Sequence, residues 1–118
     1  MSYVFDIADR TVWSPALKVG KLYIEMVASV ARILGRPSGV HAIANDYYDI
    51  DLAQFQAFVD AMAIEYAESN HDIYRHLLGV ILPISVALIF EVEPMWRPTV
   101  RLEDILDQAH DFSQKMPR

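Results

Sequence analysis

Cysteine is absent from the 118 residues of this chain. Its absence excludes disulfide bonds, thiolate zinc sites, iron–sulfur clusters and cysteine nucleophiles. Glycine is scarce as well: the four glycines stand apart from one another, so no glycine-rich loop could cradle a phosphate group. The sequence also lacks the Gly-x-Ser-x-Gly motif of serine hydrolases. No reaction is therefore indicated by a motif, and we expect no bound cofactor.

Long apolar runs and a targeting segment are missing too. The longest stretch without a formal charge covers residues 76–90, which is 15 residues, whereas a membrane-spanning helix needs about 18 or more. The first ten residues contain Asp6 and Asp9 and do not resemble a signal peptide. We therefore expect a cytoplasmic protein that has no membrane as a partner.

Basic residues are in the minority, with 10 Lys and Arg against 16 Asp and Glu, a net charge of -6. This balance argues against nucleic acid and anionic membranes as binding partners. Hydrophobic residues make up 53% of the chain, which is enough for a core. The length predicts a single domain over residues 1–118.

Three helices have recognisable boundaries. Ser14-Pro15 is typical of a helix start and Gly35 of a helix end, which predicts a helix over residues 15–34. Asp51 and Gln54 have the spacing of a capping box and predict a helix over 52–69. Thr99 is expected to cap a last helix near 100–115. Residues 36–50, between the first two helices, are expected to form a loop.

Residues 71–92 allow two interpretations. Apolar residues from Ile73 to Ile81 recur at helical spacing, whereas from Ile84 onward they alternate with other residues as in a strand. Pro83 would cost the interior of a helix about 3 kcal/mol. We favour a kinked helix over 71–92 and keep a strand over 84–93 as the alternative, which would make the fold α+β.

The fold expected from these segments is mainly α. Tyr3 to Ile7 alternate in polarity, and residues 10–13 form a second extended piece, which together predict a short N-terminal β-hairpin. The chain is therefore expected to be a four-helix bundle-like domain preceded by this hairpin.

The acidic residues are unevenly distributed. Residues 37–74 contain seven acidic residues and no Lys or Arg, although a solvated helix usually mixes charges of both signs. Tyrosines lie among these acids, and tyrosine is frequent in protein interfaces. Either this stretch binds a basic partner, or it is a solvated face, or the bases of the first helix neutralise it. The candidate partner-binding residues are Asp46, Tyr47, Tyr48, Asp49, Asp60, Glu65, Glu68 and Asp72.

Metal-binding patterns are incomplete. Asp46, Asp49 and Asp51 lack the alternation and the glycine of a calcium-binding EF-hand loop. Asp107 and His110 match the Glu-x-x-His spacing of di-iron bundles only approximately, and once, where those bundles need it twice. We therefore expect no metal site.

Three stretches carry a family resemblance. These are Tyr3-Val-Phe-Asp-Ile with Thr11-Val-Trp-Ser-Pro, then Val19-Gly-Lys-Leu-Tyr, and the ending Ser113-Gln-Lys-Met-Pro-Arg. Over nearly its full length the chain resembles a family of small actinobacterial proteins of unknown function. The resemblance implies a mainly helical fold after a short extended N-terminus, and it implies no catalytic residues.

Three functions are compatible with these observations. The first is a non-enzymatic acidic protein that binds a basic protein partner, as immunity proteins and antitoxins do. The second is a small-molecule-binding or hydrolytic bundle whose inter-helix pocket uses His76 or His110 as a polar anchor. The third is a structural homo-oligomer, in the simplest case a homodimer.

Overall fold

The N-terminal hairpin is present in the computed structural model, which describes residues 2–118. Its strands are β1 (Val4–Ile7) and β2 (Arg10–Trp13), and they pair antiparallel. The linking residues Ala8 and Asp9 have φ angles of 51° and 63°, which is the backbone of a type I′ turn. Alanine rarely adopts this left-handed conformation, so the pairing of the flanking strands, and not the local preference of Ala8, determines the turn.

The expected loop over residues 36–50 is wrong, because these residues form a second hairpin. It consists of β3 (Val40–Ala44) and β4 (Tyr47–Ile50), and β4 also pairs in parallel with β1. The four strands make one mixed sheet in the order β2-β1-β4-β3. Four of the five residues of β3 are exposed, so no buried face imposes an alternating pattern on this edge strand.

Over residues 2–118 the fold is therefore α+β, with four helices and a four-stranded mixed sheet, and the predicted mainly α, bundle-like fold is wrong. The chain divides into two compact units. Residues up to Phe58 together with Met116–Arg118 form the first unit, and Val59–Lys115 form the second. The boundary lies within the helix α2 (Leu52–Glu68). The single-domain organisation of residues 1–118 stays a prediction.

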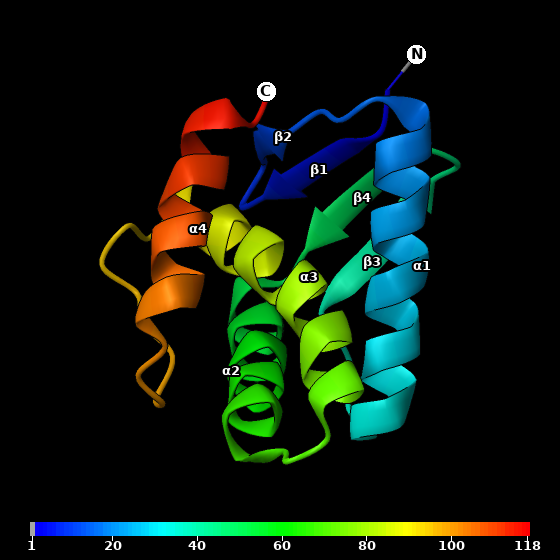
Figure 1. The fold of residues 1–118 in the computed structure, drawn as a ribbon. Coiled ribbons are helices and arrows are strands. Elements are labelled where there is room, and N and C mark those ends of the chain that lie inside the picture. Colours follow the sequence, from blue (N-terminus) through cyan, green and yellow to red (C-terminus); the bar gives the residue numbers. More distant parts are fainter. Residues whose placement is uncertain (1) are drawn as a thin grey trace. The chain divides into compact units, whose positions relative to one another are not determined.

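In the first unit the helix α1 (Leu17–Leu34) lies along one face of the sheet (Figure 1). The ring of Tyr23 on this helix meets Phe5 and Trp13 edge-on, with ring centroids 6.0 and 5.4 Å apart. A Cβ atom on Gly20 would lie 2.5 Å from Cγ of Tyr3, so this close approach of α1 to the residue before β1 requires glycine. The core of the unit is the aromatic layer between α1 and the sheet.

The start of α1 differs from the prediction. The helix begins at Leu17, with Ala16 as its N-cap and no capping side chain, so Ser14 does not cap it. Residues before Leu17 stay extended because the N–H of Tyr3 donates to the carbonyl of Pro15 at 3.0 Å. The predicted end is confirmed: Gly35 has a φ of 66° and terminates the helix.

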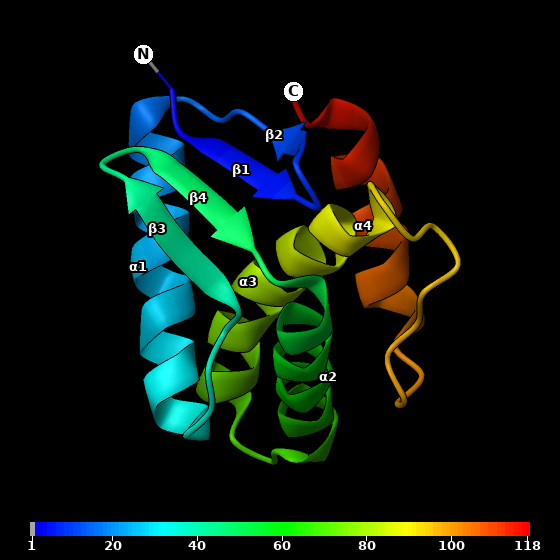
Figure 2. The ribbon, with the colours of Figure 1, turned by 180° about the vertical axis from the view of Figure 1, so that it is seen from behind.

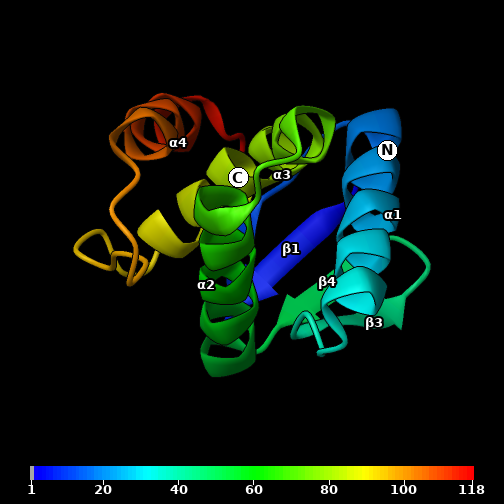
Figure 3. The ribbon, with the colours of Figure 1, turned by 60° about the horizontal axis from the view of Figure 1, so that its bottom comes forward.

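The second unit contains most of α2, α3 (Asp72–Phe90) and α4 (Glu103–Lys115). The predicted cap of α2 is confirmed, since the Asp51 carboxylate accepts from the N–H of Gln54 at 3.1 Å. The predicted Thr99 cap is wrong, because α4 begins four residues later and Thr99 bonds to α2 instead. Figure 3 shows α4 lying beside the second half of α3.

The helix α3 is continuous through Pro83, so the alternative of a strand over residues 84–93 is wrong. Nine of the ten residues from Ile81 to Phe90 are buried. A helix buried on all sides needs no polar face, and the apparent alternation after Pro83 therefore carried no information about structure. By length and composition α3 could cross a membrane, but 56% of its apolar window is buried within the structure, which agrees with a soluble protein.

Truncation of a buried side chain on α3 tests this arrangement. We expect Leu82→Ala to lower the free energy of unfolding by about 2–5 kcal/mol, because Leu82 is fully buried and its loss leaves a cavity. Leu77→Ala is the control, since Leu77 lies on the same helix and is 59% exposed. Urea unfolding measures both variants. Equal, small losses for the two would contradict the buried position of this part of α3.

Candidate functional site

One row of polar side chains crosses all four strands of the sheet. Asp6 on β1 pairs with Thr11 on β2 and with Asp49 on β4, and Asp49 pairs with His41 on β3. Directly paired residues point to the same face of a sheet, which here is the face opposite to the aromatic layer. We call these four residues and Tyr47 the outer sheet face. Figure 2 shows the sheet from this side, in front of α1.

Asp6 is the centre of this face. Its side chain is buried, and its carboxylate accepts hydrogen bonds from Oγ1 of Thr11 at 2.7 Å and from the hydroxyl of Tyr47. The bond to Asp6 raises the pKa of Tyr47, and partial burial and repulsion by the charges of Asp6, Asp49 and Asp9 raise it further. Tyr47 therefore keeps its proton, because a tyrosinate would add a negative charge beside three carboxylates.

The structure divides the predicted partner-binding residues between the two units. Asp46 lies in the turn between β3 and β4, and Tyr47 and Asp49 belong to the outer sheet face. Tyr48 points the other way: its ring stacks on Tyr3 and on Phe5, with centroids 5.6 Å apart in both pairs. Burial raises the pKa of Tyr48, and this half-buried residue faces the aromatic layer and not the outer sheet face.

The remaining predicted residues, Asp60, Glu65, Glu68 and Asp72, lie on α2 and at the start of α3 in the second unit. The Asp60 carboxylate accepts from the N–H of Thr99 at 2.7 Å and from its hydroxyl at 3.0 Å. Glu65 accepts from the hydroxyl of Tyr74 at 3.2 Å. The pKa of Tyr74 is raised, first by burial and then by Glu65. Two of the four acids thus have partners within the protein.

Asp6, Thr11 and His41 were missed by the sequence analysis. A usable signal existed for Asp6, because an acid between Phe5 and Ile7 in an alternating strand must point away from the aromatic side. Thr11 and His41 join the row only through strand pairing. No local pattern could have identified them.

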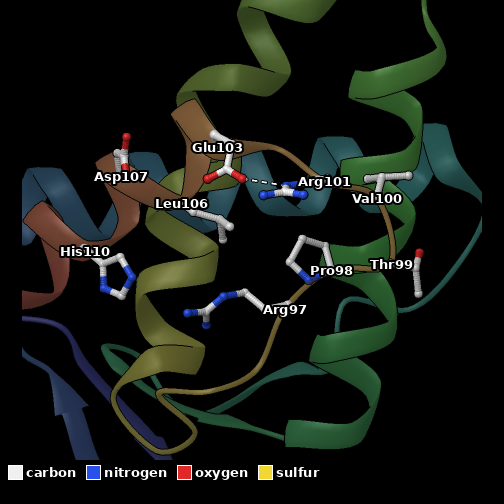
Figure 4. Close-up of a pocket in the computed structure, with 9 residues that line it drawn as sticks. All are labelled: Arg97, Pro98, Thr99, Val100, Arg101, Glu103, Leu106, Asp107 and His110. Carbon is white, nitrogen blue, oxygen red and sulfur yellow. Dashed lines mark hydrogen bonds and ion pairs between the residues drawn. The ribbon is translucent and has the colours of Figure 1, made fainter.

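A pocket of about 370 Å³ lies between α4 and the segment that precedes it (Figure 4). Its lining includes Pro98 and Leu106, while Arg97 and His110 extend toward each other at one end. Arg101 and Glu103 form an ion pair of 2.6 Å along the rim. The carboxylate of Asp107 points away from Arg97 in this view. Of the two predicted histidine anchors, His110 lines this pocket, and His76 lies on the exposed side of α3.

Phe90 positions the Arg97 and His110 side chains of the pocket. The imidazole of His110 stacks on the Phe90 ring at 4.7 Å, and the Arg97 guanidinium lies 5.2 Å from its centroid. Nη1 of Arg97 donates to the carbonyls of Pro94 at 3.0 Å and Trp96 at 2.7 Å. The pocket therefore has an oriented guanidinium at one end. Among residues 2–118 no group of three or more His, Asp and Glu side chains is arranged to hold a metal ion.

The hydrogen bonds of Asp60 make a prediction about folding. Asp60→Asn should destabilise the protein by about 1–2 kcal/mol, because the amide lacks the negative charge that strengthens the hydrogen bonds from both Thr99 groups. Glu68→Gln on the exposed side of the same helix should change stability by less than about 0.5 kcal/mol. Thermal unfolding of both variants measures the difference, and an Asp60→Asn variant as stable as the wild type would show that the charge of Asp60 does not strengthen these bonds.

Comparison with known proteins identifies the family of this chain but no curated relative and no similar solved structure. No significant match was found among curated proteins or among solved structures. The model of one protein family, described as a family of unknown function (DUF6086), matches residues 1–118. Because the match covers the whole chain, the protein belongs to the family of unknown function DUF6086.

Proposed function

We propose that this chain is a non-enzymatic interaction protein that binds a basic protein partner through the outer sheet face, as an immunity protein or an antitoxin would. The supporting observation is the arrangement of Asp6, Asp49 and Tyr47 on the face of the sheet that α1 does not cover. The hydrogen bond to Asp6 raises the pKa of Tyr47 most, followed by burial and then by the charges of Asp6, Asp49 and Asp9, so several acidic groups lie near this tyrosine. A positively charged surface would be attracted to these groups.

The acids on this face and in the adjoining β3–β4 turn differ in their roles. Asp6 is buried and bonded to Thr11 and Tyr47, so it stabilises the sheet. Asp46 and Asp49 are partly exposed and available to a partner. Charges at the rim of an interface act mainly on the association rate, because they attract the partner before contact. These two residues are therefore the ones expected to steer a basic protein.

The edge of the same sheet offers contacts other than charge. β3 is the last strand of the sheet, and its outer edge has backbone groups available for pairing. Ile43 is 63% and Tyr47 39% exposed, and such apolar and aromatic side chains supply much of the binding energy in interfaces. An extended segment of the partner could add to this edge while its basic residues approach Asp49. The cytoplasmic location, the actinobacterial source and a homodimer stay predictions from the sequence.

Neutralising the exposed acids tests the proposal. Wild-type protein, an Asp46→Asn/Asp49→Asn variant and an Asp104→Asn/Asp111→Asn control would each be immobilised and exposed to lysate of the source cells. The control removes the same charge from α4. We expect a basic protein to bind the wild type and the control but to bind the first variant weakly. Stopped-flow mixing of the purified pair should then show slower association and a flatter salt dependence for that variant.

Thermal unfolding of all three proteins ensures that the comparison concerns binding. Asn replaces Asp46 in the β3–β4 turn without loss of turn preference, and Asn at position 49 keeps the side-chain size on β4 while removing a charge opposite Asp6, so the variant should remain folded. A captured protein that binds all three equally, with equal rates at low salt, would contradict a role for the outer sheet face. Absence of any basic protein bound to the wild type would contradict the proposed function itself.

A further inference from the structure

The pocket between α4 and residues 97–101 lies in the second unit and plays no part in the proposed partner binding. We propose that it binds a small organic carboxylate with an apolar body. The carboxylate would lie between Arg97 and His110, and the apolar body would lie against Pro98 and Leu106. This site depends on residues that the outer sheet face does not use, so either proposal can be wrong without the other.

The guanidinium of Arg97 is suited to the carboxylate. Its hydrogen bonds to the carbonyls of Pro94 and Trp96 both come from Nη1, and the Phe90 ring restrains its plane. Nε and Nη2 remain as donors, and the flat edge that they form matches the two oxygens of a carboxylate. Because the side chain is already held in place, little further conformational entropy is lost on binding.

The charges around the pocket favour a monoanion over a phosphate. Arg101 is paired with Glu103 at 2.6 Å, so Arg97 is the cation that a ligand would meet first. The carboxylates of Glu103 and Asp107 also border the pocket. They repel a dianion twice as strongly as a monoanion. Imidazole can donate a hydrogen bond to the carboxylate in either protonation state.

The shape of the pocket defines the rest of the ligand. Pro98 is buried and Leu106 is half-buried, and both side chains line the cavity. A volume of about 370 Å³ is at the small end of ligand pockets and suits a single ring or a branched chain. The hydroxyl of Thr99 already bonds to Asp60, so the polar contacts of the ligand would come from Arg97 and His110.

Phenylacetate is the probe, and phenylacetamide is its neutral isostere. Titration of the full chain would be followed by the backbone amide shifts of Leu106 and His110 in NMR spectra. An open pocket and a ligand of this size predict a dissociation constant of about 1–10 mM for phenylacetate. The amide should bind about tenfold more weakly, since it lacks the charge-assisted hydrogen bonds.

Two substitutions locate the site. Arg97→Gln should weaken phenylacetate binding about tenfold, whereas Lys115→Gln, which removes a cation from α4 outside the pocket lining, should leave it unchanged. Equal affinities for phenylacetate and phenylacetamide would overturn the proposal without use of any variant. Equal weakening by the two substitutions would overturn it too, because binding would then follow net charge. NMR shifts of Leu106 and His110 that do not saturate as phenylacetate is added would also overturn the proposal.

Discussion

The sheet of the first unit depends on the buried carboxylate of Asp6. A carboxylate removed from water without hydrogen bonds would cost several kcal/mol, and here Thr11 on β2 and Tyr47 on β4 supply the donors. Three of the four strands therefore meet at one side chain. A slip of one residue between β1 and β4 would turn Tyr47 to the other face. The buried charge thus selects a single register for the parallel pair, and the ring of Tyr48 stacks on the aromatic layer as a result.

A corresponding constraint shapes the second unit. Residues between α3 and α4 have no regular structure, yet side chains hold this connection at defined points. Asp60 binds Thr99 in the middle of it, and Ser113 on α4 donates to the buried Glu91 at 2.6 Å. The pocket wall is therefore fixed by hydrogen bonds to α2, and α4 is fixed to the end of α3. The cavity is a consequence of these bonds and not of helix packing alone.

Local patterns in the sequence predicted those structural features, such as helix caps and helix ends, that are determined by residues close together in the chain. Asp51 caps α2 and Gly35 ends α1 because both effects act within one helical turn. Pairing between distant segments could not be read in this way. β3 has no buried side that would mark it as a strand, and Thr99 looked like a cap although its partner lies 39 residues away. The acid-rich stretch could be identified from the sequence because its residues are close together in the chain. The row containing Asp6 and His41 could not, because strand pairing joins residues that are far apart in the chain.

The acidic stretch has two different physical roles once the fold is known. An acid bonded within the protein stabilises the fold, whereas one left to solvent contributes mainly a field that salt screens over about 8 Å. Asp60 and Glu65 belong to the first kind because Thr99 and Tyr74 donate to them. Asp46 and Asp49 belong to the second kind because both are partly exposed, Asp46 in the β3–β4 turn and Asp49 on β4, the neighbour of the edge strand β3. Because salt screens this electric field within a short distance, it attracts a partner only when the partner is close to contact. The acids that attract a binding partner must therefore lie beside the surface that the partner covers. In the first unit that condition is met at β4.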